Sequence, residues 1–74
     1  MVEKVAVKSG YYFEIFDKDD IPKTLINTTE KVKLKGRYYE LYKATTLEDE
    51  RKVDEIFGDR MGYFIDDYLE EELE

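Results

Sequence analysis

Residues 1–17 carry the first alternation of apolar and polar side chains in the chain. If Lys8-Ser9-Gly10 forms a three-residue loop, five apolar residues share one face of a β-hairpin: Val5, Val7, Tyr11, Phe13 and Ile15. A two-residue loop at Ser9-Gly10 would instead set Val5 opposite Glu14, so the three-residue loop is preferred. The pattern predicts an N-terminal hairpin, which ends where the turn residues of FDKDDIP begin.

A second alternation runs over residues 31–44 and turns at Lys35-Gly36. A two-residue loop there gives these cross-strand pairs: Val32 with Tyr39, Leu34 with Arg37, Lys31 with Glu40, Lys33 with Tyr38 and Glu30 with Leu41. The pairing builds one apolar face from Val32, Leu34, Tyr39 and Leu41. Residues 24–28, just before this hairpin, are short and β-branched, which fits either a brief strand or a helical turn.

The period changes from strand to helix at Thr45 and Thr46, and residues 46–57 are predicted to be helical. Either hydroxyl can cap the helix, and Thr45 with Glu48 fits the capping box. Helical spacing points Leu47, Val53, Ile56 and Phe57 inward and Glu48, Asp49, Arg51, Lys52 and Glu55 outward. Gly58 is a natural helix stop.

Residues 59–74 form an acidic C-terminal segment whose pattern does not decide between helix and strand. The final EEELE is expected to be frayed. The elements together predict a single domain over residues 1–74. Its fold class is α+β, with an antiparallel sheet of two hairpins and a helix packed on one face.

The composition narrows the chemistry that this chain can perform. The 74 residues include no Cys and no His, so disulfides, the usual zinc ligands and the common general bases are missing. Ser9, the chain's single Ser, sits in a predicted turn with no base to activate it. Asp17, Asp19 and Asp20 do not fit a calcium loop, because Pro22 stands where that loop needs Gly. We expect no enzyme activity, no metal and no cofactor.

Length and hydropathy add two expectations. A 74-residue core alone supplies roughly 3 to 5 kcal/mol of stability, so self-association as a homodimer is a plausible support. No apolar run approaches the roughly 20 residues of a membrane span, and the N-terminus lacks the apolar region of a signal peptide. The sequence predicts a soluble, cytoplasmic protein with no membrane partner.

Charge is divided unevenly along the chain. The net charge is −7; residues 1–45 hold nine Lys and Arg against seven Asp and Glu, whereas residues 46–74 hold three against twelve. An acidic surface repels nucleic acid and attracts a basic groove, although acidic faces often serve solubility alone. The eleven aromatic residues, seven of them Tyr, favour a binding surface.

The second hairpin contains a basic segment, KVKLKGRYY, which could instead bind nucleic acid directly. Lys33, Lys35, Arg37 and Tyr38 match a basic, aromatic strip of a small nucleic-acid-binding module. Alternating Lys on an exposed strand is more often protection of a sheet edge, and the acidic helix that follows opposes DNA. We therefore favour a protein partner over direct nucleic-acid binding.

The segment from Gly36 to Asp59 resembles a known family. The matching residues are Gly36, Tyr38-Tyr39-Glu40, Lys43, Thr46-Leu47-Glu48-Asp49 and Phe57-Gly58-Asp59. They are similar to a pattern of the short, dimeric, phage-encoded inhibitors of uracil-DNA glycosylase. The likeness covers residues 32–69, and the N-terminal hairpin is extra.

The resemblance implies a DNA mimic that acts in the host cytoplasm. In that family carboxylates stand where DNA phosphates would lie in the enzyme groove, and an apolar pocket receives a side chain of the enzyme. The partner-binding residues carried over are Glu40, Asp54, Phe57, Val53 and Tyr39. Val53 stands where the family has Phe, and Glu50, Arg51 and Lys52 are inserted early in the helix. The family would make residues 63–69 a strand. The alternative is an acidic inhibitor of another nucleic-acid or defence enzyme, which would also bind a basic groove through its carboxylates.

Overall fold

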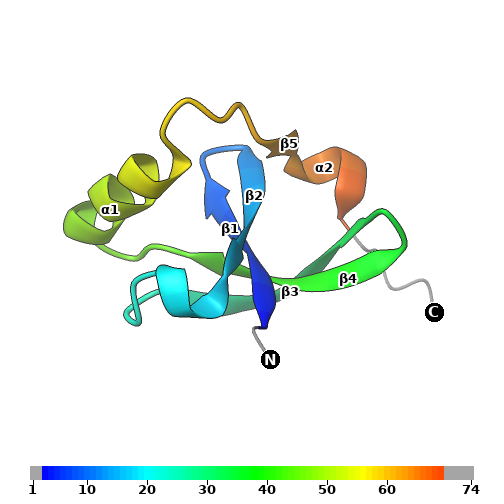
Figure 1. Cartoon of the computed structure of the whole chain (residues 1–74), viewed down its shortest axis with the longest axis horizontal. Coiled ribbons are helices and arrows are strands. Elements are labelled where there is room, and N and C mark those ends of the chain that lie inside the picture. The colour runs from blue at the N-terminus through cyan, green and yellow to red at the C-terminus, as the bar shows by residue number, and fades with distance from the viewer. Residues whose placement is uncertain (1–2, 70–74) are drawn as a thin grey trace.

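The computed structural model describes residues 3–69, which form one mixed sheet with a helix packed against it (Figure 1). In chain order the elements are β1 (Lys4–Ser9), β2 (Tyr12–Asp17), η1 (Lys18–Asp20), β3 (Ile26–Leu34), β4 (Arg37–Lys43), α1 (Leu47–Phe57), β5 (Tyr63–Phe64) and α2 (Ile65–Tyr68). The five strands lie in the order β3-β4-β1-β2-β5. The α+β class predicted from the sequence is confirmed.

The two hairpins join through β1 and β4, which run parallel, with Ala6 beside Leu41 and Val7 beside Tyr42. The prediction of a wholly antiparallel sheet is therefore wrong at this one junction. β1 lies in the middle of the sheet and is covered on both faces, so Val5, Ala6 and Val7 are all buried. A strand covered on both faces has an unbroken apolar run, as parallel strands commonly have.

The first hairpin forms with a register that differs from the prediction. Ser9 pairs with Tyr12, and Gly10 and Tyr11 form a two-residue turn. Gly10 has a φ of +61°, the conformation that a type II′ turn requires at its first central residue. Val5 consequently lies opposite Phe16 instead of Phe13. Tyr11 is not in a strand and is mostly exposed.

The second hairpin has the predicted turn and register. Lys35 and Gly36 both have positive φ, as in a type I′ turn, and Val32 lies opposite Tyr39. The strand begins earlier than predicted, at Ile26, and the predicted pair of Glu30 with Leu41 is lost at a bulge between Asn27 and Lys31. Residues 24–28, left open between strand and turn, thus enter β3 at Ile26.

Side-chain hydrogen bonds stabilise this bulge. The Thr28 hydroxyl donates to the Leu41 carbonyl at 2.9 Å and accepts from the Glu30 amide at 3.2 Å. The Asn27 side chain accepts from the amide of Thr29, whose φ is +69°. The bulge therefore replaces the lost ladder bonds with local ones.

Helix α1 has the predicted extent, but the cap is Thr46, so the predicted capping box of Thr45 with Glu48 is wrong. Two further corrections concern its faces. Thr46 is the N-cap, and its hydroxyl accepts from the Asp49 amide at 3.1 Å; Gly58 ends the helix with a φ of +56°. Leu47, predicted inward, is 76% exposed, and Asp49, predicted outward, is 5% exposed. In the first turn of α1, the side that packs against the sheet is therefore not the side that periodicity predicts.

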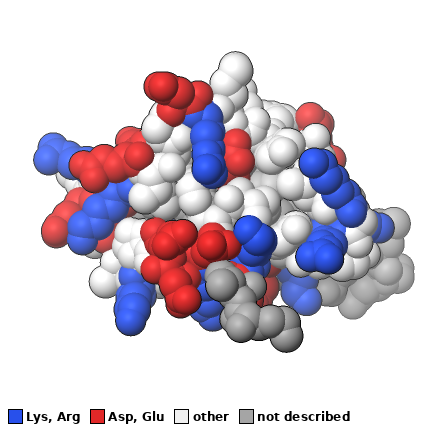
Figure 2. Space-filling view, in the orientation of Figure 1, with Lys and Arg blue, Asp and Glu red and all other residues white. Residues whose placement is uncertain are grey.

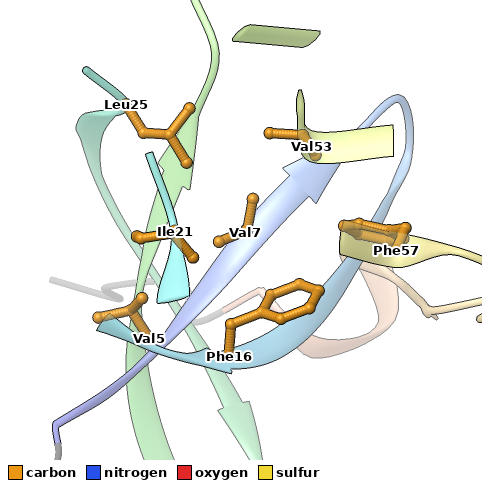
Figure 3. Close-up of a cluster of buried hydrophobic side chains, with 7 residues drawn as sticks. All are labelled: Val5, Val7, Phe16, Ile21, Leu25, Val53 and Phe57. Carbon is orange, nitrogen blue, oxygen red and sulfur yellow. The ribbon is translucent and has the colours of Figure 1, made fainter. Parts of the chain in front are cut away.

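Buried side chains form two clusters, one on each face of the sheet. The first cluster lies under α1 and contains Val5, Val7, Phe16, Ile21, Leu25, Val53 and Phe57 (Figure 3). The second contains Ala6, Phe13, Val32, Leu41 and Ile65, with Tyr39, Tyr63, Tyr68 and Leu69 packed against it. The sheet thus serves as the shared wall of two small cores.

Residues 59–69 close the second core. β5 is two residues long and pairs with Tyr12 and Phe13, α2 follows at once, and Leu69 then bridges to Val32 at the other edge of the sheet. The segment is therefore partly strand and partly helix, and the strand over 63–69 that the resemblance implies is limited to Tyr63–Phe64. EEELE lies outside the described residues. None of the helices among residues 3–69 is long and apolar enough to cross a membrane.

Candidate functional site: two cavities beside α1 and η1

The five residues expected to bind a partner occupy three different environments. Val53 and Phe57 lie one turn apart on α1, and both are buried in the first core, at 2% and 7% exposure (Figure 3). Tyr39 packs against the second core, on the opposite face of the sheet. Glu40 is half-buried and Asp54 is exposed. Of the five expected residues, only these two thus offer a carboxylate at the surface.

Glu40 lies in the middle of β4 and is held by a neighbouring side chain. Its carboxylate accepts a hydrogen bond of 2.6 Å from the Asn27 amide group, which comes from β3. Lys31 lies opposite Glu40, as the register predicts, but no ion pair joins them in the part of the chain that the structure describes. The Glu40 carboxylate is therefore oriented by a neutral donor.

A cavity with an apolar floor lies on the face of β4 to which Glu40 points, although Glu40 does not line it. Glu40 and Tyr42 are two residues apart on one strand and so point to the same face. Tyr42 lines a cavity of about 250 Å³ together with Lys18, Asp19, Ile21, Pro22, Lys23 and Leu25. The floor comes from Ile21 and Leu25, which are buried in the first core.

Lys18 stands at the rim of this apolar cavity and has an anionic and an aromatic neighbour. Its ammonium lies 3.8 Å from a Glu3 carboxylate oxygen and 5.9 Å from the centroid of the Tyr42 ring. The Glu3 charge, with a smaller contribution from Tyr42, raises the pKa of Lys18 above its ordinary value. The ammonium is therefore charged at neutral pH, at the border between an acidic and an apolar surface.

Asp54 belongs to a second, larger cavity at the other end of the β1–β4 junction. This cleft has a volume of about 460 Å³ and is lined by Lys8, Ser9, Gly10, Tyr11, Lys43, Ala44, Glu50, Val53 and Asp54. Asp54 accepts a hydrogen bond of 3.1 Å from the Ser9 hydroxyl, which fixes α1 against the end of β1. Asp54 thus lines this cleft, whereas Glu40 lines neither cavity.

Basic side chains gather on one part of the surface (Figure 2). Figure 2 shows basic side chains over the β3–β4 hairpin, acidic side chains near η1, and a mixture of both over α1. The described residues include all twelve Lys and Arg but fifteen of the nineteen Asp and Glu. No group of three or more acidic side chains in residues 3–69 is arranged to hold a metal ion.

Sequence reasoning missed the cavity residues of the loop between β2 and β3. Ile21 and Leu25 are apolar residues on either side of Pro22 in a polar stretch. Isolated apolar residues in such a loop could have indicated that it packs against the core, where both are buried. Lys8 and Lys43 carried no such signal, because only the parallel pairing of β1 with β4 brings the two strand ends together.

Comparison of the chain with protein-family models, curated proteins and solved structures found no match. The case for a function therefore rests on the residues and on the two cavities.

Proposed function

We propose that this protein is a non-enzymatic inhibitor that mimics DNA and blocks the DNA-binding groove of uracil-DNA glycosylase. The observation that carries the proposal is Glu40, an oriented carboxylate that points to the same face of β4 as Tyr42, and Tyr42 lines a surface cavity with an apolar floor. A DNA mimic needs both features together, because a phosphate-like charge attracts the basic groove and an apolar recess accepts a side chain from the enzyme. The resemblance of residues 32–69 to known inhibitors names the target.

In this proposal the five residues expected from the sequence divide into two roles. Glu40 and Asp54 offer carboxylates to basic side chains of the enzyme. Val53 and Phe57 stabilise the first core on the α1 face, and Tyr39 packs against the second core on the opposite face. The apolar recess is formed by Ile21, Pro22, Leu25 and Tyr42 instead of Phe57. The protein would act in the cytoplasm of the host cell and as a homodimer.

Uracil excision by the purified glycosylase tests the proposal directly. We expect the protein to abolish excision of uracil from an oligonucleotide at a small molar excess. Inhibition should weaken as salt rises, because the charges that attract the groove are screened. Full excision at a large molar excess of the protein would rule the proposal out.

A pair of matched double variants separates mimicry from general acidity. Glu40→Gln with Asp54→Asn removes two charges yet keeps an acceptor for Asn27 and for Ser9. Asp66→Asn with Asp67→Asn removes two charges from exposed positions on α2. We expect the first pair to weaken inhibition by at least about a hundredfold and the second by less than about threefold. Equal losses would show that net charge alone matters.

One observation favours a second function, binding of single-stranded nucleic acid by the β3–β4 hairpin. Tyr38 is 53% exposed and lies among Lys33, Lys35 and Arg37, with the Lys33 ammonium 5.3 Å from the Tyr38 ring centroid. Cations around an exposed ring are suited to phosphates and stacked bases. A labelled oligonucleotide whose anisotropy rises at low salt would support this function, and an unchanged anisotropy would remove it.

A further inference from the structure

Strand β3 lies at one edge of the sheet, and a residue from the C-terminal part of the chain pairs with it there. Val32 pairs with Tyr39 of β4 on one side, and Leu69 forms an antiparallel bridge with Val32 on the other. The backbone of Leu69 is extended, with a φ of −63° and a ψ of 129°, and its side chain packs against the second core. The chain therefore leaves α2 in a strand conformation at the β3 edge.

Two lysines flank Val32 on β3 and are called the lysine pair below. Because Val32 belongs to the second core, strand alternation points Lys31 and Lys33 to the other face of the sheet, on which α1 lies. Both lysines are exposed, and neither takes part in an ion pair within residues 3–69. Glu40, which lies opposite Lys31 on β4, accepts a hydrogen bond from Asn27 instead.

The sequence that follows Leu69 is strongly acidic. Residues 70–74 read EEELE, so four of these five residues carry a carboxylate. If the antiparallel pairing continues, each residue advances about 3.4 Å along β3 and Glu70 falls opposite Lys31. Alternate residues of a strand share a face, so Glu70 and Glu72 would both point to the face of the lysine pair.

The charges that meet on this face are complementary. Glu70 would lie directly opposite Lys31 and diagonally from Lys33, and Glu72 would lie diagonally from Lys31. Residues directly opposite have Cβ atoms roughly 5 Å apart and diagonal neighbours roughly 7 to 8 Å apart, distances that Glu and Lys side chains span. The segment is therefore long enough and correctly charged to cover the lysine pair.

We propose that residues 70–74 continue along the β3 edge from the Leu69 bridge and cover the lysine pair with the carboxylates of Glu70 and Glu72. The bridge tethers the segment beside the lysines, so its carboxylates act at a high effective concentration and compete with other anions. The segment thereby limits nucleic-acid binding by the β3–β4 hairpin. This consequence rests on the second function proposed above, whereas the contact itself does not depend on any function.

NMR of the full-length protein, labelled with ¹⁵N and ¹³C, tests the contact without nucleic acid. Cross-strand nuclear Overhauser effects should link Glu70 to Lys31 as well as Leu69 to Val32. Raising NaCl to about 1 M should shift the amide signals of the lysine pair, because salt screens the attraction. Overhauser effects that stop at Leu69 and Val32 would overturn the proposal.

Matched double variants separate this contact from general acidity. Glu70→Gln with Glu72→Gln removes two charges from the face of the lysine pair. Glu71→Gln with Glu55→Gln also removes two charges, one at the position opposite Glu30 on the other face and one at an exposed position on α1. Only the first double variant should shift the amide signals of the lysine pair. Equal shifts in both would reduce the effect to net charge and refute the contact.

Binding of a labelled single-stranded oligonucleotide at low salt measures the consequence. The first double variant should bind at least about fivefold more tightly than the original protein, and the second should stay within about twofold. With Lys31→Gln and Lys33→Gln added, the first double variant should lose its advantage. Equal gains in both double variants would contradict competition at the lysine pair. If no variant binds, the second function fails, and the Overhauser effects alone decide the contact.

Discussion

The Ser9 hydroxyl donates a hydrogen bond of 3.1 Å to the Asp54 carboxylate and so joins β1 to α1 across 45 positions of the sequence. This contact fixes one side of the 460 Å³ cleft, because Ser9 and Asp54 both line it. It also orients the Asp54 carboxylate, which the resemblance to glycosylase inhibitors assigns to partner binding.

Ser9→Ala should lower the free energy of unfolding by about 0.5 to 1 kcal/mol, at the low end for a hydrogen bond because this pair is exposed. Unfolding in urea measures the change. Ser9→Thr keeps the hydroxyl and suits a strand, so its stability should stay close to that of the original protein. A loss as large in the Thr variant as in the Ala variant would assign the effect to packing instead.

Thr46→Ala should cost about 1 kcal/mol, because the Thr46 hydroxyl accepts from the Asp49 amide at the start of α1. Thr45→Ala should change stability by less than about 0.5 kcal/mol, since Thr45 is exposed and lies before the cap. Urea unfolding of the two variants decides which Thr is the cap. The reverse order would support the capping box of Thr45 with Glu48.

Gly62→Ala should destabilise the fold by at least about 2 kcal/mol, through both conformation and packing. Gly62 has a φ of +80°, and an added Cβ would lie 3.0 Å from the Phe13 carbonyl oxygen and 3.1 Å from the Tyr12 Cβ. Gly36 has the same φ of +80° with nothing within 4 Å, so Gly36→Ala should cost only about 1 kcal/mol. Thermal unfolding of both variants separates the cost of the steric contacts at Gly62 from the cost of backbone strain. Equal losses of stability would argue against close packing at Gly62.

Phe57→Ala should cost about 3 to 5 kcal/mol, because Phe57 is buried and its ring centroid lies 5.6 Å from that of Phe16. Leu47→Ala, at the exposed start of the same helix, should change stability by less than about 0.5 kcal/mol. Chemical unfolding measures both. Unchanged stability of the Phe57→Ala protein would contradict the burial of Phe57 in the core. It would favour a surface position, in which Phe57 binds a partner.

Lys18 should make stability depend on pH in the alkaline range. Glu3 and Tyr42 raise the pKa of Lys18 above 10.5, so the folded state holds this proton more tightly than the unfolded chain does. The stabilisation is present in full below the unfolded pKa and is lost as the pH rises through the higher folded pKa. Lys18→Gln should therefore flatten the stability profile above about pH 10. NMR titration of the Lys18 side chain checks the direction, and a folded pKa at or below the ordinary value would contradict it.

The second hairpin could be predicted from the sequence because its information is local. Lys35-Gly36 selects a two-residue turn, and that turn fixes the register of Val32 with Tyr39. The first hairpin lacks that signal. β1 is buried on both faces, so the neighbouring residues Val5 and Ala6 are equally covered and alternation cannot choose between registers.

The cavities depended on contacts that no short stretch of sequence specifies. Glu40 and Asp54 could be proposed from the sequence. Ile21 was predicted to lie in a loop, and Leu25 in a segment open to either a brief strand or a helical turn, yet both are buried. Periodicity placed α1 correctly but turned Leu47 inward and Asp49 outward. These two errors arise because the packing of α1 against the sheet, and not helical periodicity, determines which side of its first turn is buried.

By itself, the sequence determined the α+β class, the second hairpin, the extent of α1 and its stop at Gly58, because propensity, turn chemistry and capping act within a few residues. The tertiary structure decided the parallel junction of β1 with β4, the register of the first hairpin, the mixed strand and helix of residues 63–68, and the cleft that Ser9 and Asp54 both line. These features arise from pairings between distant segments, and burial on both faces of β1 removes the alternation that would have predicted them.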